Sequence, residues 1–233
     1  MRTLKVDPAD KLRALKANSY FDHLSEKELH AVARCMSLRE FECGEALFWE
    51  GDPCVGLHIV QTGSVKLHRI SPQGRQYIVR ILQEHDTFNE VSVFDRGGNP
   101  VNAEALETCR VWVIEPECIR RMVDTSPDFA QKVINNLGQI LRMMVRNISE
   151  MAFYQVTHRL ARLISELPPG ELASEGGARW TQEQLAAQLG TVREVVARSL
   201  RELERSGAIH VENRRIAVAN PEVFVQWVQG PWN

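Results

Sequence analysis

The hydrophobic pattern of this chain changes its period along the sequence, and that change restricts the folds open to it. Between about Leu38 and Pro116, short runs of β-branched and apolar residues alternate with glycines, which indicates an antiparallel β domain made of hairpins. From Pro127 to about Tyr154, apolar residues instead recur every three or four positions, which indicates one long helix. Shorter helical and β patterns follow. The expected fold class is therefore α+β, with the three parts arranged in chain order.

A short amphipathic helix is predicted just before the β domain, in the stretch LSEKELHAVARCM. Ser25 is placed to cap its N-terminus, and Glu28, three residues later, completes a capping box. We expect this helix to pack beside the β domain, because its apolar stripe is too small to form a core alone.

The long helical segment carries an apolar stripe that approximates a heptad seam. Such a stripe is narrow for deep burial in one domain, so a coiled coil with a second copy of the chain is the favoured interpretation. The alternative is a long helix that lies across its own β domain. The first interpretation predicts a homodimer whose interface contains Leu137, Ile140, Met144, Ile148 and Met151.

The C-terminal part has the pattern of a winged helix-turn-helix. After Pro168-Pro169-Gly170 and a polar loop that reaches Arg179, Thr181 and Gln184 form a second capping box for a short helix. Gly190 then turns the chain into a helix over residues 192–206, and two β runs follow around a turn that bears Arg214. The predicted domains are 1–126 for the N-terminal helices and β domain, 127–154 for the dimerisation helix, and 155–233 for the winged helix.

The 192–206 helix keeps charged residues off its apolar stripe. In a helix-turn-helix the first turns of the second helix enter the DNA major groove, where Arg binds guanine and Glu accepts from cytosine. Arg193, Glu194 and Arg198 have this chemistry and spacing, and further DNA contacts are expected from Thr181, Thr191 and Arg214. The alternative is a solvated helix face whose charges pair at i, i+4, as Glu194 would with Arg198.

The composition excludes few classes of protein, but it bears on the expected partners and location of the chain. The formal net charge of −2 gives no overall attraction to nucleic acid, so a DNA site has to be a local patch. The N-terminus lacks the apolar stretch of a secretion signal, and no apolar run approaches the roughly 20 residues that span a bilayer, so we expect a cytoplasmic protein with no membrane partner. Five cysteines at wide spacing are expected to be reduced, packed thiols.

Enzyme motifs are missing from the sequence. It contains no G-x-S-x-G elbow, no phosphate-binding G-x-x-x-x-G-K-[ST] loop and no H-E-x-x-H metal helix. His85 and Asp86 are adjacent, which directs their side chains apart in a regular element and makes them a weak catalytic pair. We therefore expect no catalytic residue, no metal site and no enzyme activity.

Taken in order, these parts resemble the CRP/FNR family of bacterial transcription regulators. The resemblance rests on GEALFWEGDPCVGLHIVQTGSVKL and DTFNEVSVF in the β domain, and on TQEQLAAQLGTVREVVARSLREL near the C-terminus. It implies a cyclic-nucleotide-binding-type β-roll, a dimerising helix and a winged helix. It also implies that Arg193, Glu194 and Arg198 read a palindromic TGTGA-type site, that an effector in the β-roll shifts the dimer geometry, and that the bound dimer activates transcription through RNA polymerase.

The expected effector pocket departs from the family pattern for cyclic AMP. In the resembled receptors a Gly-Glu pair holds the ribose, an Arg-Ser pair holds the phosphate, and a Thr-Ser pair on the dimer helix meets adenine. Glu90 is present here, but the Gly position is Asn89, and the remaining positions are Pro100, Val101, Met144 and Val145. Without a bidentate arginine a buried phosphate is costly, so cyclic AMP is disfavoured. Arg96 is the nearest arginine, and Glu90 is expected to be a structural acceptor for backbone N–H groups.

Other effectors of the family stay open. An iron-sulfur cluster is disfavoured because only Cys35 and Cys43 lie near the N-terminus, too few for four thiolates. EHDTFNEVSVF and VTHRLARLI are closer to the nitric-oxide-responsive, haem-associated regulators of the family. In that case His85 is the suggestive histidine, because it occupies a position that the family usually gives to Gly. Haem, another apolar effector, or no effector at all remain the alternatives. The rival function is a ligand-binding regulatory module that acts through protein contacts without binding DNA.

Overall fold

The structure is a computed structural model that describes residues 1–167, 180–212 and 215–230. It contains two compact units, the first formed by residues 1–69 and 79–142, the second by residues 70–78 and 143–233. The division between them falls inside the long helix, whereas the sequence pattern placed boundaries at its two ends. The predicted stop at Pro168-Pro169-Gly170, the polar loop that reaches Arg179, and the predicted wing residue Arg214 lie outside the described residues.

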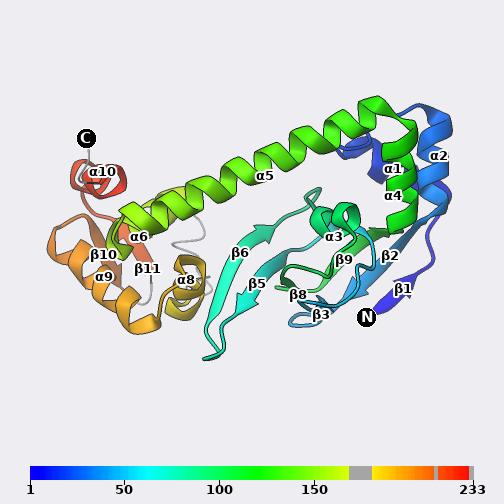
Figure 1. Cartoon of the computed structure of the whole chain (residues 1–233). Helices are drawn as coiled ribbons and strands as arrows, with labels where there is room; N and C mark the ends of the chain where they lie inside the picture. The colour runs from blue at the N-terminus through cyan, green and yellow to red at the C-terminus, as the bar shows by residue number, and fades with distance from the viewer. Residues whose placement is uncertain (168–179, 213–214, 231–233) are drawn as a thin grey trace. The chain divides into compact units, whose positions relative to one another are not determined.

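The elements of the N-terminal part follow the order expected from the hydrophobic pattern (Figure 1). In chain order they are β1 (Arg2–Leu4), α1 (Pro8–Ala17), α2 (Glu26–Arg34), β2 (Met36–Phe41), β3 (Ala46–Phe48), β4 (Leu57–Thr62), β5 (Val65–Ile70), β6 (Gln76–Leu82), β7 (Thr87–Phe88), α3 (Glu90–Asp95), β8 (Asn102–Ala105), β9 (Cys109–Ile114), α4 (Pro116–Thr125) and α5 (Pro127–Phe153). The chain is α+β, with an N-terminal β-roll and a long helix after it.

Two antiparallel sheets form the β-roll, one in the order β1-β2-β9-β4-β7 and the other in the order β3-β8-β5-β6. Strand β9 shows how alternation builds two cores, because successive side chains point to opposite faces of a sheet. Val111 packs in the core that includes Phe41, Val65 and Leu82, while Trp112 belongs to the core that the helices share. Both residues are 1% exposed or less.

Helices cover one face of the first sheet. The capping box predicted for α2 is confirmed, since the Ser25 side chain accepts from the Glu28 N–H and Glu28 accepts from the Ser25 N–H. Leu29 of α2, Ile119 of α4 and Phe129 of α5 are buried in the same core as Trp112. The helix therefore packs beside the β domain as its amphipathic stripe predicts.

The turn between β4 and β5 needs glycine. Gly63 has a φ of 78°, and a Cβ there would lie 2.8 Å from the Thr108 carbonyl oxygen. An L side chain would therefore meet both left-handed strain and a backbone clash. Gly63 therefore allows the turn to pass close to the start of β9, just after the register shift between Val60 and Thr62 in the β4–β9 pairing.

The second unit contains α6 (Val156–Glu166), α8 (Gln182–Leu189), α9 (Arg193–Arg205), β10 (Ile209–Glu212), β11 (Arg215–Val218) and α10 (Pro221–Gln229). Its helices and its antiparallel strand pair share one apolar core built on Leu160, Leu185, Val196, Leu203 and Phe224. Polar contacts fasten that core: the Thr157 hydroxyl lies 3.0 Å from the Ser199 hydroxyl, and the Trp227 indole N–H donates to the Ser206 hydroxyl at 2.9 Å. This arrangement is a winged helix.

The predicted packing of the cysteine thiols holds only in part. All five are free thiols, and Cys109 and Cys118 are buried. Cys43 is exposed, while Cys35 and Cys54 are half-buried. The expectation of uniformly packed thiols was wrong for Cys43, which lies in the turn between β2 and β3, where the apolar alternation that buries strand residues is interrupted.

Candidate DNA-binding surface and effector position

The helix-turn-helix is set by a capping box and a glycine. The Thr181 hydroxyl accepts from the Gln184 N–H at 3.1 Å, and the Gln184 side chain accepts from the Thr181 N–H at 2.7 Å. Gly190 ends α8 with a φ of 64°, and the following N–H, of Thr191, donates to the Ala186 carbonyl at 2.9 Å. A left-handed residue at this point is the usual way to end one helix and redirect the chain. Both predicted features are present.

Helix α9 has one buried face and one exposed charged face. Val196, Leu200 and Leu203 are buried in the core of the second unit, which orients the helix. Arg193 and Glu194, in its first turn, and Arg198 are exposed. The three residues that the sequence selected for base contacts are therefore among those that this helix presents away from its own core.

The charged face of α9 is only lightly engaged by the protein itself. Arg193 lies 3.4 Å from the side-chain oxygen of Gln182 and 3.4 Å from a carboxylate oxygen of Glu183, two residues of α8 that the sequence reading did not single out. Among the described residues, the side chains of Glu194 and Arg198 make no hydrogen bond or ion pair. The i, i+4 pair of the solvated-face alternative is therefore not formed in this structure.

The remaining predicted DNA contacts are distributed around the helix-turn-helix. Thr181 is exposed at the start of α8, and Thr191 is half-buried in the turn. Arg214 is outside the described residues, but the strands on either side of it pair with Glu212 opposite Arg215. Arg215 is exposed. Its guanidinium therefore places a positive charge beside the predicted wing turn.

Glu90, the one pocket residue kept from the family pattern, is buried among protein groups. It begins α3 and is 5% exposed. The Asn136 amide donates to its carboxylate at 3.3 Å, and Asn136 also donates to the Tyr20 hydroxyl. Burial raises the pKa of Glu90 to about 7, against the lowering effect of its hydrogen bonds and of Arg80. Glu90 was expected to accept from backbone N–H groups; its carboxylate does accept from a backbone N–H, its own, and it also bonds the side chains of Tyr20 and Asn136, which the sequence did not point to.

The raised pKa of Glu90 predicts a pH-dependent stability. The folded state favours the protonated carboxyl, so between the ordinary value of 4.5 and about 7 the folded protein binds more protons than the unfolded chain, and stability falls as pH rises. Glu90→Gln should remove this loss and stabilise the protein at pH 8 by about 3 kcal/mol, the size that such a shift carries. Urea unfolding at pH 5 and pH 8 measures it.

The matched control is Glu84→Gln, which removes the same charge at an exposed position. It should leave the pH dependence unchanged. Equal stability curves for Glu90→Gln and the unmodified chain would contradict the assignment of Glu90 as a buried, neutralised carboxyl.

Two residues that replace family glycines adopt left-handed backbone. Asn89 has a φ of 71° and His85 a φ of 74°. Asn and His are among the residues that tolerate this region best, so both positions are explained by the backbone. Asn89 also donates to the Gly56 carbonyl at 3.2 Å and accepts from the Ser92 hydroxyl at 3.1 Å. His85 is exposed, and its own carbonyl accepts from the Asn18 amide at 3.1 Å.

The other predicted pocket residues differ in how far they are buried. Pro100 is exposed and Val101 half-buried, and Met144 is half-buried on α5. Beside the Glu90 cluster, a cavity of about 120 Å³ is lined by residues that include Tyr20, Asn136 and Gln139. Ligand pockets commonly measure about 300–1,000 Å³, so this space is small for a nucleotide.

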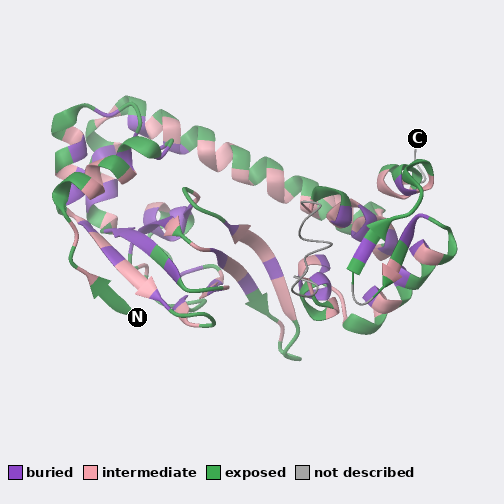
Figure 2. Cartoon of the chain, turned by 180° about the vertical axis from the view of Figure 1, so that it is seen from behind, coloured by how far each residue is buried: buried purple, intermediate pink, exposed green. Residues whose placement is uncertain are grey.

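The long helix α5 leaves a stripe of apolar side chains exposed, and this stripe includes Ile148 and Met151 of the predicted interface. Only Phe129 and Val133 of α5 are buried, and Figure 2 shows the rest of the helix as half-buried or exposed. Leu137 packs against the core of the first unit, and Ile140 and Met144 are half-buried. The most exposed large apolar residues are Ile134 (61%), Leu141 (65%), Val145 (54%), Ile148 (65%), Met151 (42%) and Phe153 (70%).

Residues 1–167, 180–212 and 215–230 contain no cluster of three or more His, Cys, Asp or Glu side chains arranged to hold a metal ion. Within them, no helix combines the length and the apolar character needed to cross a bilayer.

Comparison with known proteins matches both parts of the chain. A cyclic nucleotide-binding domain family model matches residues 38–126, and a Crp-like helix-turn-helix domain family model matches residues 158–226. A CRP-like cAMP-activated global transcriptional regulator of Mycobacterium tuberculosis is 27% identical over 207 residues, which cover 87% of this chain and 92% of that protein. A global nitrogen regulator of Synechococcus elongatus is 24% identical over 86% of this chain and 93% of that protein.

Solved structures share the fold. A CRP/FNR-family transcriptional regulator of Thermus thermophilus has a TM-score of 0.66 and 24% identity over 83% of this chain and 98% of that one. The c-di-GMP responsive global regulator of Xanthomonas campestris has a TM-score of 0.70 and 21% identity over 84% of this chain and 100% of that one. With both family models matched in order, and with the winged helix and β-roll in place, the chain belongs to the CRP/FNR family of DNA-binding transcription regulators.

Proposed function

We propose that this chain acts as a homodimer that reads a palindromic, TGTGA-like DNA site with the 192–206 helix and activates transcription by contacting RNA polymerase. The observation that carries the proposal is the exposed set of Arg193, Glu194 and Arg198 on α9, opposite the buried apolar stripe of the same helix. An arginine fork can bind guanine O6 and N7 together, and a carboxylate can accept from cytosine N4. Glu194 and Arg198 have no protein partner among the described side chains, so binding DNA would not require them to break a hydrogen bond or an ion pair within the protein.

Dimerisation through α5 is supported by its exposed apolar stripe. Ile134, Leu141, Val145 and Ile148 follow one another at steps of seven, four and three residues, which is the spacing of a coiled-coil seam. Monomeric proteins rarely leave such a stripe in water. This stripe shares Ile148 with the predicted interface but leaves out Leu137, which packs against the core of the first unit, and we take it as the centre of the dimer interface.

The effector is proposed to be other than cyclic AMP. Pro100 and Val101 stand where a phosphate clamp would need an arginine and a serine, and neither side chain can neutralise a phosphate. The names of the relatives themselves include a cAMP-activated regulator and a c-di-GMP responsive one, so likeness in sequence and fold leaves the ligand open. A more apolar effector, haem included, or none is compatible with the replaced residues.

Cyclic AMP should therefore fail to stabilise the protein. A ligand at a hundredfold excess over its Kd raises the unfolding free energy by about 2.7 kcal/mol, which shifts the melting temperature by several degrees. We expect no shift with cyclic AMP at about 1 mM, a concentration that exceeds ordinary nucleotide Kd values. The M. tuberculosis regulator, melted beside it, is the positive control. A shift of several degrees in this chain would contradict the missing clamp.

A salt titration tests the DNA-binding proposal. Binding of a duplex by Arg contacts to phosphates releases counterions, so the logarithm of the association constant should fall linearly with the logarithm of salt concentration, by about 0.9 per phosphate contacted. Fluorescence anisotropy of a labelled duplex measures this slope. Absence of duplex binding at low salt would instead favour the rival function, a regulatory module that acts through protein contacts alone.

A further inference from the structure

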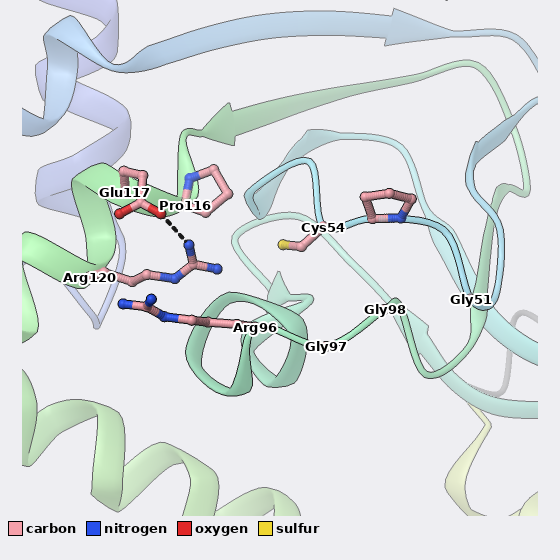
Figure 3. Close-up of a pocket in the computed structure, with 9 residues that line it drawn as sticks. Gly51, Cys54, Arg96, Gly97, Gly98, Pro116, Glu117 and Arg120 are labelled. Carbon is pink, nitrogen blue, oxygen red and sulfur yellow. Dashed lines mark hydrogen bonds and ion pairs between the residues drawn. The ribbon is translucent and has the colours of Figure 1, made fainter.

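A second cavity lies in the first unit, away from Glu90. It has a volume of about 540 Å³ and is lined by Gly51, Pro53, Cys54, Arg96, Gly97, Gly98, Pro116, Glu117 and Arg120 (Figure 3). Asn89, Glu90, Pro100 and Val101, the residues of the expected effector pocket, are not part of its lining. The volume falls within the range of about 300–1,000 Å³ that is common for small-molecule sites.

Two arginines from different elements reach this cavity, as Figure 3 shows. Arg120, on α4, is held by a hydrogen bond from Nε to the Val93 carbonyl at 2.7 Å, and one end of its guanidinium pairs with Glu117. Arg96, at the C-terminal end of α3, makes no hydrogen bond or ion pair through its guanidinium with any described residue. The cavity therefore holds one positive charge that no carboxylate of the described residues pairs with.

The rest of the lining suits an anion with an organic part. The carboxylate of Asp95, the residue before Arg96, accepts a hydrogen bond from the Gly97 N–H at 2.7 Å and does not pair with the Arg96 guanidinium. A Cβ at Gly51 would meet no atom within 4 Å, so this glycine lets a ligand approach the backbone closely, and Pro53 gives an apolar wall. The N-terminus of α4 has Pro116 in its first turn and no side-chain cap, so its dipole adds positive potential.

We propose that this cavity binds a small, multiply charged organic oxyanion, with Arg96 and Arg120 as its charged donors. Guanidinium forks match phosphate and carboxylate oxygens in pairs, and this geometry serves both. Glu117 limits affinity, because it competes for Arg120 and repels an anion. None of the lining residues belongs to the proposed DNA-binding surface or to the expected effector pocket, although Asn89 donates to the Cys54 thiol at 3.6 Å, so the proposed function can fail without affecting this site.

Calorimetric titration of the full chain in chloride buffer tests the site, with pyrophosphate and citrate as the two probes. Saturable binding of either probe, one per chain, is expected, and the probe that binds more tightly identifies a phosphate or a carboxylate ligand. Arg96→Asn removes the free charge while keeping a residue that tolerates the φ of 63° at this position. It should weaken binding about tenfold or more, as the loss of a charge-assisted contact does.

Two further variants separate a built site from general charge attraction. Glu117→Gln should tighten binding several-fold, and its exposed side chain makes a folding defect improbable as a cause of a change in this direction. Arg34→Gln removes the same charge from an exposed position outside the cavity and should change nothing. Equal weakening by Arg34→Gln and Arg96→Asn, or no binding of either probe, would overturn the proposal.

Cys54 offers a readout at the site itself. Its thiol lines the cavity, whereas Cys43 is exposed elsewhere in the same unit and serves as an internal control. A saturating concentration of the probe should slow the alkylation of Cys54 by N-ethylmaleimide several-fold and leave the alkylation rate of Cys43 unchanged. Peptide mass spectrometry measures both rates. Calorimetric binding without protection of Cys54 would place the anion elsewhere and overturn the assignment.

Discussion

Arg193→Ala should abolish most of the specific DNA affinity. A bidentate arginine–guanine contact carries about 1–3 kcal/mol of discrimination, and a symmetric dimer loses two, so the expected loss is roughly 30-fold to more than 10,000-fold on a palindromic site. Affinity for random duplex should fall far less, because the exposed guanidinium then loses only a phosphate attraction. Competition anisotropy with specific and random duplexes measures both quantities.

Glu194→Ala and Arg205→Ala are the matched variants for this result. Glu194→Ala should relax the preference at the neighbouring cytosine and slightly strengthen binding to random DNA, because removing a negative charge eases phosphate approach. Arg205 is exposed in the last turn of the same helix, so Arg205→Ala removes the same charge as Arg193→Ala but at a position far from the first turns. If Arg205→Ala weakened specific binding as much as Arg193→Ala, charge alone would account for the affinity, and base reading by α9 would be wrong.

The double variant Leu141→Glu with Ile148→Glu should convert the protein to monomers. Each residue is 65% exposed in the single chain and is proposed to meet its copy across the interface. Four carboxylates in an apolar interface would be desolvated without partners, at a cost of several kcal/mol. Analytical ultracentrifugation should show a monomer at micromolar concentration, and affinity for a palindrome should drop to the non-specific level, on the order of 1,000-fold lower.

Asn135→Glu with Gln139→Glu is the control for the dimer. Both residues are exposed on α5 and lie off the apolar stripe, so the variant adds the same charge to the same helix. It should remain dimeric. If the Leu141→Glu, Ile148→Glu variant remained a stable dimer, the interface would lie elsewhere. If that variant stayed dimeric while Leu137→Glu with Met144→Glu dissociated the dimer, the interface would be the seam that the sequence pattern selected.

Local signals predicted local structure well. The capping boxes at Ser25 and Thr181 and the left-handed turn at Gly190 depend on residues within a few positions of one another, and all three are present. The exposed face of α9 was also predictable from residue spacing, because the apolar stripe on the other side of the helix packs in the core of the second unit. These features require no knowledge of distant contacts.

Features that depend on distant residues were not readable in the same way. Spacing alone placed Leu137 in the predicted seam on α5, but it could not tell that this side chain also packs against the core of the first unit. Glu90 was identified, but Tyr20 and Asn136, which lie far from it in sequence, were not. His85 drew attention as a histidine, whereas its left-handed φ of 74° explains the departure from glycine as a matter of backbone.

Selection of binding sites from a random duplex library tests the central claim most directly. The unmodified protein should return a palindromic consensus with TGTGA-like half-sites about one DNA turn apart, as paired recognition helices require. Selections with Arg193→Ala and with Glu194→Ala should each lose the preference at one base pair per half-site and keep the rest. Absence of a palindrome with the unmodified protein, or the same consensus from all three proteins, would contradict the assignment of α9 as the recognition helix.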